Sequence, residues 1–210
     1  AAILEVQGGP GDFRVRLQAP HGVLEERVGA VILAPELHSE ALPAPAEVAP
    51  HPGIISLTRL EEVLASPEAA DACLDAAAPR LTVALLTGFT DEAHPLMLRR
   101  VLAAAARLLA RDNLAVHLFV RDAKVAAPGL EAALETAMAA GLVLYKLPQA
   151  PALTVEDDRA CLRFFEPVMQ REMALSCDLA VLEEAYRAAP GNPALAQLLG
   201  LFPGPRGFLQ

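Results

Sequence analysis

The sequence LTVALLT at residues 81–87 decides the fold class, because a short and nearly uninterrupted apolar run is typical of a parallel strand covered on both faces. The residues after it alternate between helix and strand patterns. In order, the predicted elements are a helix over residues 95–110, the strand LAVHLFV over 114–120, a helix over 129–140 and the strand LVLY over 142–145. Such alternation forms right-handed crossovers on a parallel sheet. We therefore expect an α/β protein with a Rossmann-like parallel sheet core.

The helix predicted over residues 95–110 has an apolar side and a charged side. Its apolar residues recur at spacings of three and four: Leu98, Val101, Leu102, Ala105, Leu108 and Leu109. Four arginines fall largely between these positions: Arg99, Arg100, Arg107 and Arg111. A solvated helix side explains the arginines best, and a docking face for an acidic partner is the alternative. Capping chemistry for the helix start is expected from Thr90, Asp91 and Glu92.

Antiparallel β-meanders are predicted on both sides of this core. Residues 13–17 alternate apolar and charged side chains, as a half-exposed antiparallel strand does. The first meander is predicted over residues 2–28, and the second is predicted as strands 153–156, 160–166 and 171–175. A buried strand follows each meander, at residues 29–34 and 178–182. Prolines among small residues make 35–52 a linker. We therefore divide the chain into domains at residues 1–52 and 53–210.

The composition excludes several classes of partner. The chain has 26 Asp and Glu against 17 Lys and Arg, a net charge of −9, and no dense basic run. Neither a nucleic acid nor an anionic membrane is therefore expected as a partner, and no apolar run is long enough to span a bilayer. Three cysteines without a close pair indicate buried thiols in a reducing, cytoplasmic compartment, with no disulfide framework or zinc site. The opening residues, AAIL, look like a chain entered partway through a strand, so we expect a piece of a longer protein.

Several stretches resemble, in collinear order, the flavoproteins with two dinucleotide domains, the pyridine nucleotide-disulfide oxidoreductase superfamily. In particular, they resemble the flavin-carrying A subunit of heterodisulfide reductase. GDFRV at residues 11–15 resembles the G-N-F-x-V strand of that family, and VGAVILA at 28–34 resembles its strand that ends in Ala-Thr-Gly beside the flavin. PGIISLTRLE at 52–61 resembles its N-V-I-T-S-L-E-F-E-R segment, and VALLTGFTDE at 83–92 resembles its I-Q-C-V-G-S-R-D-E. FVRD at 119–122 resembles its F-Y-R-D, and CDLAVL at 177–182 resembles its A-D-L-V-V-L.

The resemblance implies a truncated FAD/NAD(P)-binding-domain-like fold. It also implies that the intact protein carries FAD and passes electrons among the subunits of a cytoplasmic complex, with the chemistry supplied by the flavin. Residues 1–52 would be the end of the flavin-type domain, and residues 53–210 would be a second dinucleotide-binding-like domain. In this comparison Ala34 is the residue placed beside the flavin. The oligomeric state is not predicted.

The chain also departs from the family. It contains no G-x-G-x-x-G motif of the kind that holds the flavin pyrophosphate at a helix N-terminus. Pro35 and Glu36 stand where Thr-Gly is expected. Where relatives carry a cysteine-rich segment, residues 95–103 read PLMLRRVLA, which offers no iron–sulfur ligand. We therefore expect no cofactor to bind this piece of chain by itself.

Candidate cofactor contacts lie at the ends of the central strands. Thr87, Gly88 and Thr90 lie at the carboxyl end of the first central strand, where open α/β sheets bind ligands. A tight βα turn explains them better than a nucleotide pocket does, because one glycine stands in place of three. Arg121, with Asp122 and Lys124, follows the next strand and would meet an adenosine ribose or its 2′-phosphate; a solvated loop is the preferred interpretation.

The sequence gives no catalytic residue and no metal site. The histidines are scattered, and His117 in a strand is interpreted as a hydrogen-bonded core residue. Two functions from different classes remain: a piece of a FAD-dependent oxidoreductase subunit of the heterodisulfide reductase A type, or a non-catalytic α/β interaction or scaffold module that has lost cofactor binding. A third, an NAD(P)-binding enzyme domain, requires Gly88 and Arg121 to replace a full fingerprint.

Overall fold

The computed structural model describes residues 2–41, 48–74, 80–90 and 94–209. The chain divides into two compact units, Glu40–Ala185 and a second unit formed by Ala1–Ser39 with Tyr186–Gln210. These units divide the chain differently from the predicted boundary after residue 52, because the last residues of the chain belong with the first ones. The assignment of the two predicted domains to a flavin-type and a second dinucleotide-type domain stays a prediction.

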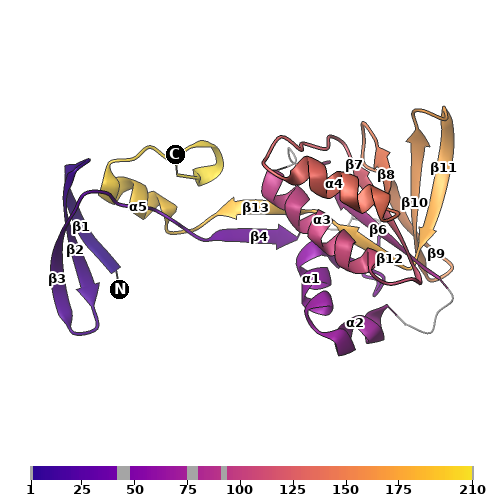
Figure 1. Cartoon of the computed structure of the whole chain (residues 1–210), viewed down its shortest axis with the longest axis horizontal. Coiled ribbons are helices and arrows are strands. Elements are labelled where there is room, and N and C mark those ends of the chain that lie inside the picture. Colours follow the sequence, from indigo (N-terminus) through magenta and orange to yellow (C-terminus); the bar gives the residue numbers. More distant parts are fainter. Residues whose placement is uncertain (1, 42–47, 75–79, 91–93, 210) are drawn as a thin grey trace. The chain divides into compact units, whose positions relative to one another are not determined.

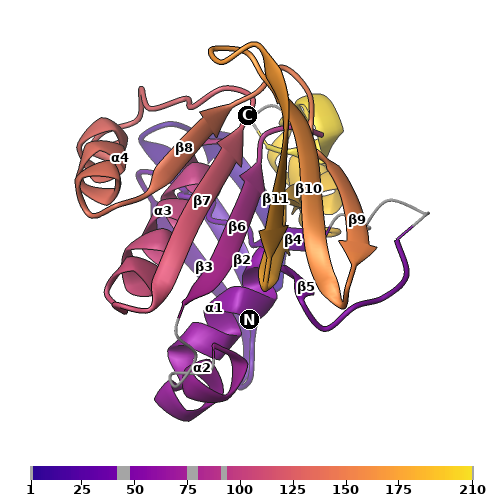
Figure 2. The same ribbon diagram turned by 90° about the vertical axis from the view of Figure 1, so that its right-hand side faces the viewer.

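The larger unit is built on a five-stranded parallel sheet. Its order is β5 (Ile54–Ser56), β12 (Leu179–Leu182), β6 (Leu81–Thr87), β7 (Leu114–Val120) and β8 (Val143–Lys146). Every neighbouring pair is parallel, and Figure 2 shows β6, β7 and β8 side by side. The predicted α/β fold with a parallel sheet core is therefore confirmed.

Helices cover one face of this sheet. They are α1 (Leu57–Ala65), α2 (Pro67–Cys73), α3 (Pro95–Leu109) and α4 (Leu130–Ala139). α3 packs on β6 and β7 as well as on α1 and α4, and its core-facing side carries Leu98, Val101, Ala105 and Leu108, none more than 3% exposed. The apolar side predicted for this helix is thus the buried one. Asp91 and Glu92, predicted to cap it, lie outside the described residues, and the N-cap is His94, whose Nδ1 accepts from the amide of Leu96 at 3.1 Å.

An antiparallel sheet covers the other face. It consists of β9 (Ala152–Glu156), β10 (Arg159–Glu166) and β11 (Arg171–Cys177), with β10 in the centre. Because side chains alternate along a strand, Ala84 and Leu86 of β6 face this meander and join its apolar cluster. Phe119 and Phe164 meet edge-to-face there at 5.1 Å. The unit is therefore layered as helices, parallel sheet and antiparallel meander (Figures 1 and 2).

The smaller unit contains the first meander and the end of the chain. Its elements are β1 (Ala2–Gly9), β2 (Asp12–Ala19), β3 (Gly22–Val28), α5 (Asn192–Leu199) and η1 (Pro205–Gly207). β2 pairs with both β1 and β3 in antiparallel register. α5 ends at Gly200, which has the left-handed φ of +63° that suits a C-cap glycine. A separate two-stranded sheet joins β4 (Leu37–Ala41) and β13 (Glu184–Ala188).

One predicted strand is wrong. Residues 29–34, interpreted as a buried apolar strand, form no strand, and Ile32 is 90% exposed. A strand needs a neighbour that accepts and donates its backbone hydrogen bonds, and an apolar run shows only that one face would pack. At the start of this segment, the amide of Gly11 donates to the carbonyl of Gly29 at 2.8 Å. The predicted linker is also partly ordered, since β4 lies within residues 35–52.

Candidate functional site

The strand order of the parallel sheet makes the carboxyl end of β6 the expected ligand-binding edge. The chain leaves β6 toward β7 on one side, whereas β12, which comes much later in the sequence, lies on the other side. Ligands of open α/β sheets bind where the connections part in this way, outside the carboxyl ends of the strands. The loop of residues 88–90, Arg121 after β7 and Glu183 after β12 all follow these strand ends, and they constitute the candidate site.

The loop after β6 is bound by a carboxylate of the chain itself. Oε2 of Glu183 accepts from the backbone amide of Phe89 at 2.9 Å. Oε1 accepts from the amide of Thr90 at 2.7 Å and from the Thr90 hydroxyl at 2.6 Å. Bonds from amides and hydroxyls to an ionised carboxylate are stronger than neutral ones. The carboxylate of Glu183 thus satisfies both amides and the Thr90 hydroxyl.

This arrangement does not fit a dinucleotide pyrophosphate. Backbone amides at the start of a βα unit are the groups that hold phosphates in dinucleotide folds. Here two of them are already satisfied by Glu183, and its negative charge would repel a second anion at the same place. Neither amide is therefore free to bind a pyrophosphate, and no step of flavin or nicotinamide chemistry can be assigned to the described residues of this loop.

The other predicted contacts lie close to this loop or in the smaller unit. Thr87 is 1% exposed, and its hydroxyl has no hydrogen-bond partner among the described residues. Gly88 has a φ of +80°, which a glycine adopts without strain. Arg121 Nη1 donates to the carbonyl of Phe89 at 3.3 Å, so it braces the same loop. Ala34 belongs to the smaller unit and lies, exposed, in the segment that forms no strand. Whether any of these residues contacts a nucleotide stays a prediction.

A second carboxylate, that of Glu184 at the start of β13, connects two helices. Glu184 is 6% exposed; its Oε1 accepts from the amide of Thr58 at 2.6 Å, and its Oε2 accepts from the Thr58 hydroxyl at 2.9 Å. Arg100 of α3 pairs with it at 3.1 Å and with Glu61 of α1 at 2.7 Å. The cluster therefore joins β13, α1 and α3 through charges that are largely withdrawn from water.

The three arginines of α3 and Arg111 after it all bind neighbouring segments. Arg100 lies in the cluster with Glu184, and Arg107 donates to the carbonyl of Leu64. Arg111 pairs with Asp71 of α2 at 2.7 Å, and Arg99 donates to the carbonyl of Pro128 at 3.0 Å. Arg99 and Arg107 are exposed, as a solvated side predicts, whereas Arg100 and Arg111 are half-buried, so the prediction of a solvated side holds for two of the four. Helix periodicity identifies a polar face but not what that face meets.

Burial is the main cause of the pKa shifts of His117 and Cys177. Desolvation, helped by the charge of Arg80, lowers the pKa of His117, and its Nδ1 has no hydrogen-bond partner in the described part of the chain. The predicted hydrogen bond is thus missing at that nitrogen, and the ring stacks on Tyr145 instead. Burial, and to a lesser extent Asp178, raises the pKa of the Cys177 thiol to about 12. Cys161 is also buried, whereas Cys73 is exposed, contrary to the expectation for all three thiols.

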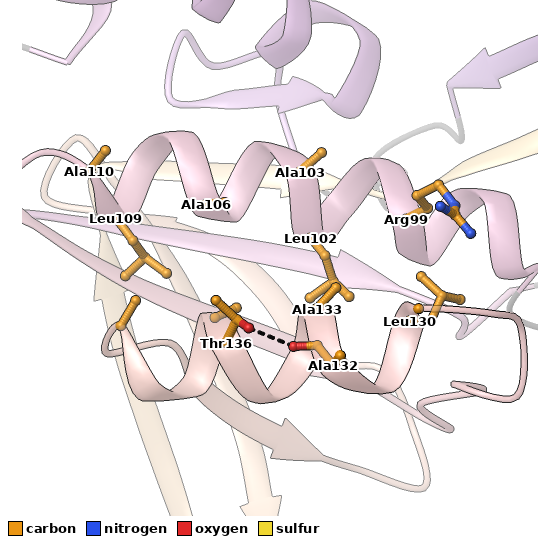
Figure 3. Close-up of a pocket in the computed structure, with 13 residues that line it drawn as sticks. Arg99, Leu102, Ala103, Ala106, Leu109, Ala110, Leu130, Ala132, Ala133 and Thr136 are labelled. Atoms are coloured by element: carbon orange, nitrogen blue, oxygen red, sulfur yellow. Dashed lines mark hydrogen bonds between the residues drawn. The ribbon is translucent and has the colours of Figure 1, made fainter.

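An open groove of about 690 Å³ runs between α3 and α4. Figure 3 shows that small and apolar side chains line it, with Arg99 and Thr136 as the polar exceptions. The Thr136 hydroxyl donates to the carbonyl of Ala132 at 2.7 Å, so it is already satisfied. The groove is therefore an apolar surface depression whose lining suggests no catalytic or metal-binding role. Within the described ranges, no three His, Cys, Asp or Glu side chains gather as metal ligands, and no described helix is long and apolar enough to cross a bilayer.

Comparison with known proteins yields distant structural likenesses. No protein family model matches the chain, and no curated protein matches it. Among solved structures, the HOCl-induced flavoprotein disulfide reductase RclA from Escherichia coli is 11% identical with a TM-score of 0.44, and L-lysine 6-monooxygenase from Pseudomonas syringae is 16% identical with a TM-score of 0.45. Ornithine N-hydroxylase from Kutzneria sp. 744, in a complex with reduced FAD, NADP⁺ and L-ornithine, is 11% identical with a TM-score of 0.43.

These likenesses extend along the chain but over only part of each relative. They cover 98%, 98% and 95% of this chain and 40%, 57% and 56% of those proteins, respectively. The chain thus spans less than two thirds of each. At such identities and TM-scores, the comparisons assign no function to it.

Glu183 is the site residue that the sequence analysis missed. It lies directly after a predicted buried strand, next to Glu184, and two carboxylates at the carboxyl end of a parallel strand are a signal that places charge at a ligand-binding edge. The signal does not say which loop they meet, because Phe89 lies 94 positions earlier in the chain.

Proposed function

We propose that this chain is part of a FAD-dependent oxidoreductase subunit of the heterodisulfide reductase A type. The observation that supports it is the location of the collinear stretches. Three of them contain or end at the carboxyl ends of β6, β7 and β12, at one edge of the parallel sheet. Stretches that are far apart in sequence and share one functional edge are expected of a dinucleotide-type domain.

In this proposal the chain contributes framework and orientation. The intact protein carries FAD and passes electrons to other subunits of a cytoplasmic complex. The flavin supplies the redox chemistry when bound, and groups outside the loop of residues 88–90 hold it, since Glu183 already satisfies the amides there.

The experiment is an absorbance spectrum of the product of the full reading frame that contains these 210 residues, purified and then incubated with FAD and desalted. We expect flavin absorption bands, with FAD released on denaturation and identified by chromatography. A protein without these bands, even after incubation with FAD, would contradict the proposal.

A second candidate is a non-catalytic scaffold module. The carboxylate of Glu183 bound to Phe89 and Thr90 favours it, because a chain that needs no nucleotide at this loop has no reason to keep the amides free. Reading the full frame discriminates the two: a G-x-G-x-x-G strand–turn–helix before these residues supports the flavoprotein, and its absence supports the scaffold. Calorimetric titration with NADH and NADPH tests the third hypothesis, an NAD(P)-binding enzyme domain, and the absence of heat with both would refute that hypothesis.

A further inference from the structure

We propose that Glu183 acts as a built-in substitute for a nucleotide phosphate, so that the dinucleotide-type unit is closed to nucleotides by its own chain. The inference rests on the fold part of the proposed function and not on the electron-transfer role. A dinucleotide-type fold would hold a pyrophosphate at the carboxyl end of β6, yet Glu183 already binds the donors of the loop of residues 88–90.

The donors form an anion site in their present state. Two successive backbone amides and one hydroxyl converge on the two carboxylate oxygens of Glu183 at 2.6 to 2.9 Å. Successive amides that point to one place make a concavity for anions, and phosphate and carboxylate oxygens satisfy it alike. Glu183 therefore supplies the anion that the loop requires.

The adjacent residues support the inference that Glu183 occupies the anion site formed by the amides of Phe89 and Thr90. Arg121 fixes the loop from the β7 side through the carbonyl of Phe89. At the same end of β6, the buried hydroxyl of Thr87 has no hydrogen-bond partner in the part of the chain that the structure describes. Glu184, the next residue after Glu183, places its carboxylate at the amide of Thr58 near the start of α1. Both carboxylates after β12 thus bind amides at the starts of segments.

The carboxylate also determines the outcome for a competing ligand. A phosphate that approached Phe89 and Thr90 would have to displace the Glu183 carboxylate. The displaced carboxylate would then lie beside the phosphate without its present hydrogen-bond donors. Displacement costs those charge-assisted bonds, and like charges repel. Removing the carboxylate frees both amides, and the exposed donors then favour an anion from solution.

The test is calorimetric titration of inorganic pyrophosphate into the wild-type chain and into Glu183→Ala. We expect no saturable heat with the wild type, and an affinity at least about tenfold higher in Glu183→Ala. Glu172→Ala is the matched control, because it removes the same charge from an exposed position on β11 and should behave like the wild type. Amide signals of Phe89 and Thr90 should shift on titration in Glu183→Ala only.

Three results would overturn the inference: wild type and Glu183→Ala that bind pyrophosphate equally, a folded Glu183→Ala without binding, and a gain of equal size in Glu172→Ala. If Glu183→Ala fails to fold, Glu183→Gln decides, since it keeps an acceptor oxygen and loses the charge. It should bind pyrophosphate more tightly than the wild type, and equal affinity would refute the inference. The flavin spectrum reports on the intact protein independently, so the two proposals fail separately.

Discussion

Arg100 connects three elements through Glu184 and Glu61, and its loss should be costly because Glu184 stays buried. The Glu184 side chain is 1% exposed and that of Arg100 is 19% exposed. Removing one member of a buried ion pair leaves an uncompensated charge, so Arg100→Met should lower the free energy of unfolding by about 3 kcal/mol. Arg59→Met is the control, since its pair with Glu62 is more than half exposed on both sides and should change stability by less than about 1 kcal/mol. Equal losses in urea unfolding would contradict the role of the cluster.

His117 should make stability depend on pH. Burial holds its folded-state pKa below the usual value, so the unfolded chain binds the proton more readily as the pH falls. The stability linked to His117 is therefore complete above its unfolded pKa of about 6.5 and is lost as the pH falls toward the folded value. Wild type should lose more stability than His117→Gln between about pH 7.5 and about pH 5.5. Parallel curves for the two proteins in thermal melts would show that this ring does not titrate as inferred.

The three cysteines should react at different rates. Cys73 is exposed, whereas Cys161 and Cys177 are buried, and the raised pKa of Cys177, about 12, keeps that thiol protonated. Because the thiolate is the reactive form, a disulfide reagent should modify one thiol rapidly in the native protein and the other two only after denaturation. Mass spectrometry of the digested product identifies the site. Rapid native modification of Cys177 would contradict its burial.

At the scale of elements, β5 depends on a close approach at Gly53. A Cβ atom placed there would lie 2.8 Å from the carbonyl oxygen of Asp178 and 3.1 Å from Nδ1 of His51. The carbonyl of Gly53 also accepts from the amide of Ala180 at 2.7 Å. Gly53→Ala should therefore push β5 away from β12 and cost about 1–3 kcal/mol.

Gly191→Ala serves as the control for Gly53→Ala, because a Cβ there meets nothing within 4 Å and its φ is −77°. It should leave the midpoint of thermal unfolding nearly unchanged. A Gly53→Ala protein as stable as the wild type would mean that β5 does not need this contact.

The elements show what sequence patterns can and cannot predict. β6 and β7 match the predicted bounds, 81–87 and 114–120, because fully buried parallel strands carry apolar side chains on both faces. Residues 29–34 carry the same pattern but form no strand, because pairing depends on a neighbour that the pattern does not contain. Arg100 was predicted on the polar side of α3, yet its partners come from segments 39 and 84 positions away.

For the molecule as a whole, the succession of strands, helices and meander was predicted over residues 81–182, but the layer that the meander forms on the parallel sheet was not. The candidate edge was also predictable, since Thr87, Gly88 and Arg121 follow strands that the sequence makes parallel neighbours. Its state was not. The bond between Glu183 and the loop joins residues more than 90 positions apart, and an anion supplied by the chain leaves no motif of the kind that a phosphate-binding loop leaves.

We propose that the larger unit keeps a dinucleotide-type fold in which Glu183 occupies the amides at the ligand-binding edge. The most direct measurement is a titration of the ¹⁵N-labelled wild-type chain with NADPH, followed through the amide signals of Phe89 and Thr90. Because Glu183 holds both amides, we predict that neither signal moves. A saturable shift of both signals would show that the nucleotide displaces Glu183, and it would contradict the account.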